Sequence, residues 1–286
     1  MNSFSFTNSI LRNFAKHLIK WRVMKYCKRD KSIDAKLIYD YLKENELTYY
    51  NYTWFNKFDC TKDYNIVQDK DGRWYVMYNG YKMYFKKSWS RNRIEEYLNN
   101  LLPEQDKRSP HLYFEEKENK DSYDVVVDAG VAEGLFALDV IDKCRKIYLI
   151  EPDEEWGEAI RKTFSSFGNK VVFIDKFLGL ETNDSTCTLG SILNEVDNID
   201  LVKLDIEGAE LDALKGAGEG IDRVSEIIVC VYHYQNEEDD VLNFLNDLHN
   251  VNINYTVRKG YIFFVHDTNQ KYPYLRHGVV RIKIQR

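Results

Sequence analysis

The chain lacks long hydrophobic runs and paired cysteines. No stretch of its 286 residues approaches the run of about twenty apolar residues that spans a bilayer, and its N-terminus lacks the apolar block and cleavage site of a signal peptide. These absences predict a cytoplasmic protein without a transmembrane segment. The five cysteines are scattered and form no CxxC pair, which predicts reduced structural thiols rather than disulfides.

Negative charge outweighs positive charge outside the N-terminus. The net charge is −6, yet residues 1–31 carry eight Lys or Arg against one Asp, so the remainder carries −13. An acidic body repels phosphate backbones, and we therefore expect no nucleic-acid partner. Residues 6–28 show apolar side chains at helical spacing among basic ones, which predicts an amphipathic helix. Packing on its own domain, packing in a homodimer and weak membrane-surface contact all remain open for it.

Residues 1–120 are predicted to form a small α+β N-terminal domain. Residues 64–86 alternate with period two and are interrupted by Asp71-Gly72 and Asn79-Gly80, a pattern that predicts a three-stranded antiparallel meander. A helix is expected around Ser90–Leu102, before a charged linker. We expect this domain to shape acceptor binding or dimerisation.

Residues 121–286 alternate between strand and helix patterns, as in a mostly parallel sheet covered on both faces. Strands are predicted at 123–128, 146–151, 170–175, 199–205 and 226–232, and helices near 134–144, 153–167, 188–196, 209–217 and 239–249. Two terminal strands, 255–267 and 278–284, are expected to pair antiparallel at the edge. The fold class is therefore α/β, with a Rossmann-like, mostly parallel seven-stranded sheet and an antiparallel C-terminal edge.

The stretch 125–134, VVVDAGVAEG, is the most informative part of the chain, because a buried strand leads directly into a glycine turn. Gly130 and Gly134 allow a tight turn and close backbone approach to a ligand. A dinucleotide-binding turn carries no acids because pyrophosphate sits on it, whereas this one carries Asp128 and Glu133. The turn suits a cationic ligand, and S-adenosylmethionine carries both a sulfonium and an ammonium group.

A second carboxylate supports the same cofactor. The apolar strand in KIYLIEPD (146–153) ends at Glu151, which follows Asp128 by 23 residues. In a βαβ unit, an acid about twenty residues after the glycine turn accepts hydrogen bonds from the ribose hydroxyls. Together the two elements predict an adenosyl-cofactor site.

The chain resembles the FkbM-type S-adenosylmethionine-dependent methyltransferases over roughly residues 95–286. The resemblance rests on Asp128-Ala-Gly130-Val-Ala-Glu133-Gly134, Glu151-Pro152-Asp153, Thr188-Leu189, Leu201-Val-Lys203-Leu-Asp205-Ile-Glu207-Gly208-Ala-Glu210 and Val231-Tyr232-His233. The commonest family pattern has Asn-Ile where this loop carries Ala132-Glu133. The resemblance implies O-methylation of a sugar hydroxyl, on a free, nucleotide-linked or lipid-linked precursor.

The predicted strand ends bring several titratable side chains to one cleft, because ligands bind at the carboxyl ends of parallel strands. They are Asp128, Glu151, Asp175, Asp205, Glu207 and His233. We expect cofactor contacts from the glycine turn, Glu151 and Asp175. Methyl transfer to an alcohol also needs a base.

His233, whose ordinary pKa lies near neutrality, is the predicted base, with Asp205 or Glu207 orienting it. Alternatively, these three residues hold a divalent metal that lowers the pKa of the acceptor, since D-x-E on a strand directs both carboxylates to one face. Lys203, inside an apolar strand, is expected to form a structural ion pair.

The linker before the cofactor domain carries Glu104, Arg108 and His111, which could close over the cofactor, with Arg108 on its carboxylate. Two rival functions remain. A nicotinamide-dependent sugar oxidoreductase would share the sheet and the ribose acid, but the chain lacks its GxGxxG loop and the Tyr-x-x-x-Lys pair after the fourth strand. A non-catalytic cofactor-binding scaffold is the other rival.

Overall fold

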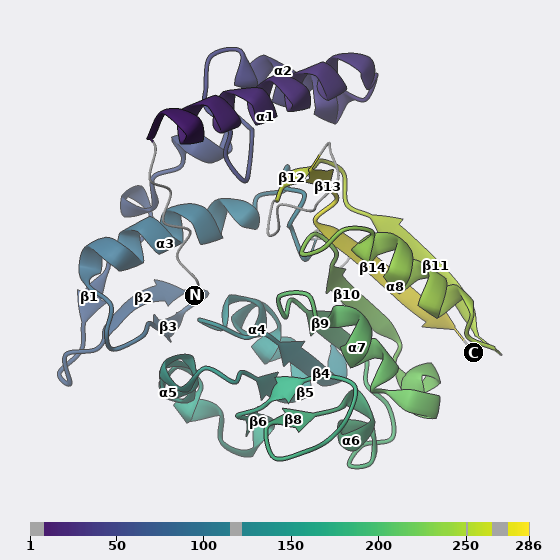
Figure 1. The fold of residues 1–286 in the computed structure, drawn as a ribbon. Helices are drawn as coiled ribbons and strands as arrows, with labels where there is room; N and C mark the ends of the chain where they lie inside the picture. Colours follow the sequence, from purple (N-terminus) through teal and green to yellow (C-terminus); the bar gives the residue numbers. More distant parts are fainter. Residues whose placement is uncertain (1–8, 115–121, 250, 265–273, 286) are drawn as a thin grey trace.

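The predicted parallel strands lie next to one another in a seven-stranded sheet (Figure 1). The computed structural model describes residues 9–114, 122–249, 251–264 and 274–285. The parallel strands are β4 (Tyr123–Ala129), β5 (Cys144–Ile150), β6 (Val171–Ile174), β9 (Leu201–Leu204) and β10 (Glu226–Cys230). The sheet order is β11-β14-β10-β9-β4-β5-β6, which confirms the predicted fold class.

The C-terminal edge of the sheet is antiparallel, as predicted. β14 (Val279–Gln285) runs against both β10 and β11 (Asn252–Val257). The predicted strand over 255–267 is wrong, because β11 ends at Val257 and the chain turns at Gly260, whose φ is +98°. β12 (Ile262–Phe263) then pairs with β13 (Leu275–Arg276) in a separate small sheet, and residues 265–267 lie outside the described residues.

Helices cover both faces of the sheet. α4 (Leu135–Val140) and α5 (Glu154–Thr163) share one apolar core with the β4–β5 face, and α6 (Leu189–Leu193), α7 (Glu210–Lys215) and α8 (Glu237–Asn246) share the core on the other. Val126 faces the first core, whereas Val125 and Val127 face the second, as the period of a strand requires. The helices predicted at 134–144 and 153–167 end early, in the 3₁₀ turns Ile141–Lys143 and Ser165–Lys170.

Residues before the linker pack in two separate places. The predicted meander is confirmed as β1 (Val67–Gln68), β2 (Trp74–Tyr78) and β3 (Tyr81–Tyr84), followed by α3 (Arg91–Glu104) with Ser90 as its N-cap. These elements share the core of α4 and α5. By contrast, α1 (Ser9–Arg29) and α2 (Ile33–Leu42) lie side by side at the top of Figure 1 and share a core with β12 and β13. The domain boundary near residue 120 stays a prediction.

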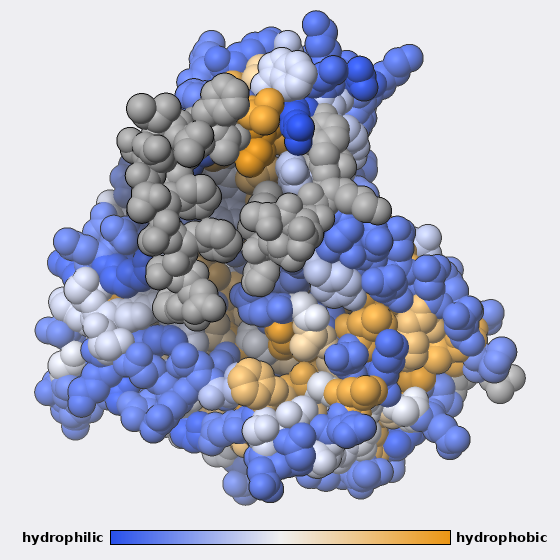
Figure 2. All heavy atoms as spheres, in the orientation of Figure 1, coloured by the Kyte–Doolittle hydropathy of each residue, from blue (hydrophilic) through white to orange (hydrophobic). Residues whose placement is uncertain are grey.

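The N-terminal helix packs on its own chain through a different face from the predicted one. Val23 and Cys27 are buried, whereas Leu18 and Trp21, which the helical pattern placed on the apolar face, are 39% and 55% exposed. Figure 2 shows mainly hydrophilic residues over α1 and α2 on the visible face. Within the described residues, none of the helices has the length and apolarity to cross a membrane. All five cysteines are buried and unbridged, which agrees with their predicted structural role.

Candidate active site

The glycine turn after β4 approaches the neighbouring strand too closely for any side chain. Gly130 has φ +71°, and a Cβ atom there would lie 1.9 Å from the carbonyl oxygen of Asp205. Gly134, the N-cap of α4, has φ +89°, and its Cβ would lie 2.8 Å from the ring of Phe164. Both positions therefore need glycine, as the sequence indicated.

A pocket of about 500 Å³ lies at the carboxyl ends of β4, β5 and β9, where an open parallel sheet binds its ligand. Apolar side chains, among them Trp156, Phe177 and Leu178, form part of its wall. The described lining residues include five carboxyl groups and two lysines: Glu104, Glu133, Glu151, Asp205, Glu207, Lys176 and Lys203. The pocket therefore favours a ligand with positive charge.

Glu151 lines the pocket directly after β5. One of its carboxylate oxygens accepts a hydrogen bond from the backbone N–H of Ala132 at 2.9 Å, and the other accepts one from the N–H of Asp153 at 2.9 Å. These two bonds hold the carboxylate between the glycine turn and the start of α5. Each oxygen keeps a further lone pair for a ligand hydroxyl.

Glu133 also lines the pocket, but its carboxylate is largely held by the protein. It accepts hydrogen bonds from the hydroxyl of Tyr97 and from the N–H of Leu135. Burial raises the pKa of Glu133 in spite of these bonds.

Asp128 lies behind the glycine turn and not among the pocket residues. Its side chain is 1% exposed, and Lys203 Nζ lies 3.2 Å from Asp128 Oδ1. The same ammonium donates to the carbonyl oxygens of Ala129 at 3.2 Å and Gly130 at 2.7 Å. The ion pair expected for Lys203 is confirmed. Asp128 therefore supports the glycine turn through Lys203 and does not reach the pocket.

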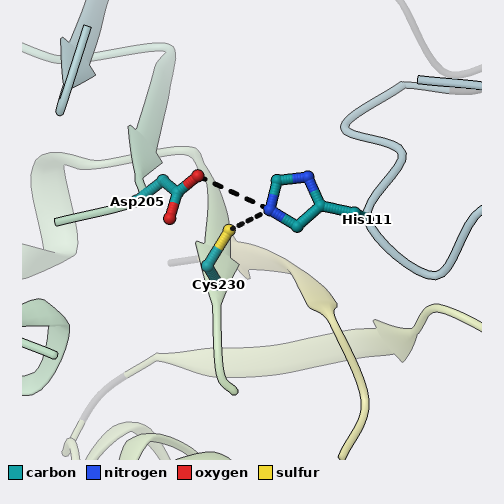
Figure 3. A group of neighbouring side chains, drawn as sticks. All are labelled: His111, Asp205 and Cys230. Atoms are coloured by element: carbon teal, nitrogen blue, oxygen red, sulfur yellow. Dashed lines mark hydrogen bonds and ion pairs between the residues drawn. The ribbon is translucent and has the colours of Figure 1, made fainter. Parts of the chain in front are cut away.

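Asp205 is the centre of the polar floor of the pocket. It accepts a hydrogen bond from the hydroxyl of Tyr113 at 2.8 Å, and its carboxylate lies 3.5 Å from His111 Nε2 and 3.4 Å from His233 Nε2. Burial alone would raise the pKa of Asp205, but the two histidines hold it well below its usual value. Figure 3 shows Asp205 and Cys230 facing the same nitrogen of His111.

His233 is enclosed by carboxylates and does not line the pocket. Its Nδ1 lies 3.2 Å from Glu210 and 3.7 Å from Glu237, opposite the contact with Asp205. Burial would lower the pKa of His233, but the three acids outweigh burial and raise it to about 12. A histidine that stays protonated cannot accept the proton of an alcohol at neutral pH. The three carboxylates disfavour His233 as the base, and the base role stays a prediction.

Glu207 does not join the predicted group with Asp205 and His233. β9 ends at Leu204 and Glu207 has φ +59°, so the period-two rule of a strand no longer applies there. Glu207 is exposed at the pocket, and Glu210 takes the place that was predicted for it. Two sets of described residues have metal-compatible spacing: Asp205 with Glu210 and His233, and Asp205 with His111 and Cys230.

Two other residues predicted to contact the cofactor lie elsewhere. Asp175 forms a surface ion pair with Arg161, with N···O distances of 2.8 and 2.6 Å, and it is not among the pocket residues. Arg108 pairs with Asp106 at 2.7 Å and lies over the ring of Trp54. Of the linker residues, Glu104 and His111 reach the pocket.

The sequence analysis named Glu104 but missed the rest of the pocket face of α3. Tyr97, Leu101 and Glu104 line the pocket from one face of this helix. Their spacing of four and three residues is the signal that could have identified that face. No comparable pattern marks Glu237, which reaches His233 from the start of α8.

Comparison with known proteins agrees with the sheet and the pocket. A family model described as the methyltransferase FkbM domain matches residues 106–262, more than half of the chain. No curated protein matches.

Solved structures are similar to the chain at low identity. Methyltransferase FkbM from Methylobacillus flagellatus KT is 21% identical, with 60% of this chain and 47% of that chain covered and a TM-score of 0.46. Trm5b from Pyrococcus abyssi is 12% identical, with 75% of this chain and 56% of that chain covered and a TM-score of 0.43. TrmK from M. capricolum, in complex with S-adenosyl-homocysteine, is 18% identical over 57% and 62%, with a TM-score of 0.35.

These structural likenesses concern the fold alone, and the chain spans about half the length of the Methylobacillus structure. The family match covers the glycine turn, Glu151 and the Asp205 floor. The chain therefore belongs to the FkbM family of S-adenosylmethionine-dependent methyltransferases.

Proposed function

We propose that the protein methylates a hydroxyl group of a sugar or polysaccharide precursor with S-adenosylmethionine as the methyl donor. The observation that carries this proposal is that Glu151 and Asp205 line one pocket. Glu151 suits the ribose of the cofactor, and the ionised Asp205 suits an acceptor hydroxyl. An acidic pocket also fits the positive sulfonium and ammonium groups of the cofactor.

The cofactor supplies a methyl group on a good leaving group, so the protein mainly has to position the acceptor and remove its proton. We assign Glu151 to the ribose hydroxyls and Glu133 to the amino-acid end. Trp156 and Phe177 offer an apolar wall for the adenine base of the cofactor. Asp128 acts through Lys203 as a positioning residue.

The proton acceptor should be a group that lines the pocket, which favours Glu104 or His111 over His233. We assign His233 the role of positioning Asp205, because its protonated ring lies between Asp205 and Glu210. Asp205 then orients the sugar by accepting a hydrogen bond from a neighbouring hydroxyl of the acceptor.

Metal assistance is the alternative for lowering the pKa of the acceptor. A divalent ion at Asp205, Glu210 and His233 would have to replace the proton that His233 shares with these carboxylates. We therefore propose transfer without a metal. Activity that a chelator abolishes and a divalent ion restores would contradict this.

The acidic balance of the chain supports a carbohydrate acceptor over a nucleic acid. An oxidoreductase or a non-catalytic scaffold would differ first in the ligand bound. Calorimetric titration with S-adenosylhomocysteine, S-adenosylmethionine and NAD separates the oxidoreductase from the other two functions, and a methylation assay on sugars then separates the methyltransferase from the scaffold.

For the methyltransferase, we expect micromolar binding of both adenosyl ligands, and Glu151→Gln should weaken it by about tenfold or more. Glu154→Gln, at an exposed position three residues further on, is the matched control. Binding of NAD alone would support the oxidoreductase. Cofactor binding without methylation of any sugar tested would favour the scaffold.

A further inference from the structure

A second cavity, of about 570 Å³, adjoins the cofactor pocket. Glu104 and Tyr232 line both cavities, so the two meet at these side chains. The remaining described lining residues come from 48–56, Asn100, Ile262 and Phe264. Most of them precede the residues that the FkbM family model matches.

The lining of this cavity is aromatic and neutral. Tyr50 and Phe55 stack with ring centroids 4.3 Å apart, and Tyr232 meets Phe264 edge-on at 5.4 Å. Amide side chains and further aromatic rings complete the wall, and Glu104 is the one charged group among the described lining residues. Phosphate groups are normally bound by Arg or Lys, which this described lining does not offer. Aromatic rings and amides instead suit the C–H faces and hydroxyls of a sugar.

The junction between the two cavities has an unfilled hydrogen-bonding position. His111 Nδ1 is buried, lies 3.9 Å from Glu104 Oε2 and has no hydrogen-bond partner among the described residues. This distance is too long for a direct hydrogen bond. A ligand hydroxyl there could accept from His111 Nδ1–H and donate to Glu104, which would satisfy both groups.

We propose that this second cavity, hereafter the acceptor cavity, binds the acceptor as a neutral sugar ring, with the reacting hydroxyl between Glu104 and His111. The inference rests on the function proposed above and adds the position of the acceptor, its charge class and its base. The acceptor oxygen gives its proton to the Glu104 carboxylate and forms a bond to the methyl carbon. The carbon–sulfur bond of the cofactor breaks, and its electron pair stays on sulfur.

The surroundings of Glu104 support its role as base. Burial raises the pKa of Glu104 to about 7, with the nearby acids Asp205 and Glu133 raising it and His111 and the Tyr50 hydroxyl lowering it. A base with a pKa near the working pH is effective, because it is partly ionised and still binds a proton well.

Saturation-transfer NMR on the full chain tests binding without requiring turnover. The probes are the methyl glycosides of glucose, galactose, mannose and N-acetylglucosamine, with UDP-glucose, methyl glucuronide and phenol as contrasts. We expect signals from at least one neutral glycoside. Tyr49→Ala, which changes an exposed residue of the acceptor cavity, should weaken its binding by about fivefold or more.

Tyr255→Ala is the matched control, because Tyr255 is similarly exposed but lies on β11, away from the acceptor cavity. Signals confined to UDP-glucose, methyl glucuronide or phenol would overturn the inference. So would glycoside binding that survives Tyr49→Ala, or no glycoside signal from a protein that binds S-adenosylhomocysteine. Failure to bind S-adenosylhomocysteine would instead refute the proposed function itself.

Glu104→Gln tests the base separately. We expect the bound glycoside to give unchanged NMR signals, kcat to fall by about a hundredfold or more, and the rise of kcat between about pH 6 and pH 8 to disappear. Glu96→Gln, an exposed position on the same helix, should retain both rate and pH profile. An unchanged pH profile in Glu104→Gln would show that a group other than Glu104 takes the proton of the acceptor hydroxyl.

Discussion

Two buried ionic groups lie at neighbouring strand ends and differ in how their charges are balanced. The loop pair consists of Asp128 and Lys203, one acid and one base. The histidine cluster consists of His233 and three acids, Asp205, Glu210 and Glu237. Burial raises the pKa of Asp128 to about 6 and that of Glu237 to about 7. In both groups, therefore, loss of solvent disfavours the ionised carboxylate.

The two groups differ in their connection to the pocket. Lys203 directs its hydrogens to Asp128 and to the carbonyls of Ala129 and Gly130, so the loop pair mainly holds the turn. The histidine cluster extends through Asp205 to the pocket wall, and from there to Tyr113 and His111. Carboxylates at strand ends are thus not equivalent, because their partners decide whether they hold the backbone or meet the ligand.

The largest effect is expected from breaking the loop pair. Lys203→Met leaves Asp128 and two carbonyl groups without a buried cation, and we expect a loss of about 4 kcal/mol in the free energy of unfolding. Urea unfolding measures it, with Lys215→Met, at an exposed position of α7, as control. A loss below about 1 kcal/mol would show that the turn does not depend on this pair.

Breaking the histidine cluster should cost less, and the cost should depend on pH. The pKa of His233 is about 12 in the folded protein, against 6.5 ordinarily. Its stabilising contribution is therefore complete below about pH 6.5 and declines as the pH rises towards 12. We expect His233→Gln to lower the free energy of unfolding by about 3 kcal/mol near pH 6 and by less near pH 9.5.

The half-exposed His277, which pairs with Glu238, provides the control His277→Gln. Its effect should be small at both pH values, since exposed pairs contribute about 0–1 kcal/mol. A loss in His233→Gln that does not change between these pH values would contradict a protonated His233.

The smallest effect is expected at Asp175, because its ion pair lies on the surface, whereas the other two ionic groups are buried. Its partner Arg161 is also exposed, so Asp175→Ala should change the free energy of unfolding by less than about 0.5 kcal/mol. S-adenosylhomocysteine affinity, measured by calorimetry, should stay within about twofold of wild type. A tenfold loss of this affinity would show that Asp175 contacts the cofactor, as the sequence predicted.

Local patterns predicted much of the cofactor half of the site. The glycine turn was predicted from Gly130 and Gly134, and neither position admits a Cβ, because the Asp205 carbonyl crowds the first and the Phe164 ring crowds the second. Glu151 was predicted from its place at the end of an apolar run, and it lines the pocket. The period-two rule failed at Glu207, because it assumes a strand that had already ended at Leu204.

The amino-acid sequence by itself determined the order of strands and helices, the glycine turn and the family, since each depends on residues close together in the chain. Only the tertiary structure decided that His233 is held by Glu210 and Glu237, that Glu104 and His111 face one another, and that residues near 50 meet Phe264. The contacts of His233 with Glu210 and of the residues near 50 with Phe264 join segments that are distant in the chain. The pKa values of these side chains follow from their burial and from neighbouring charges, and both arise only when the chain has folded.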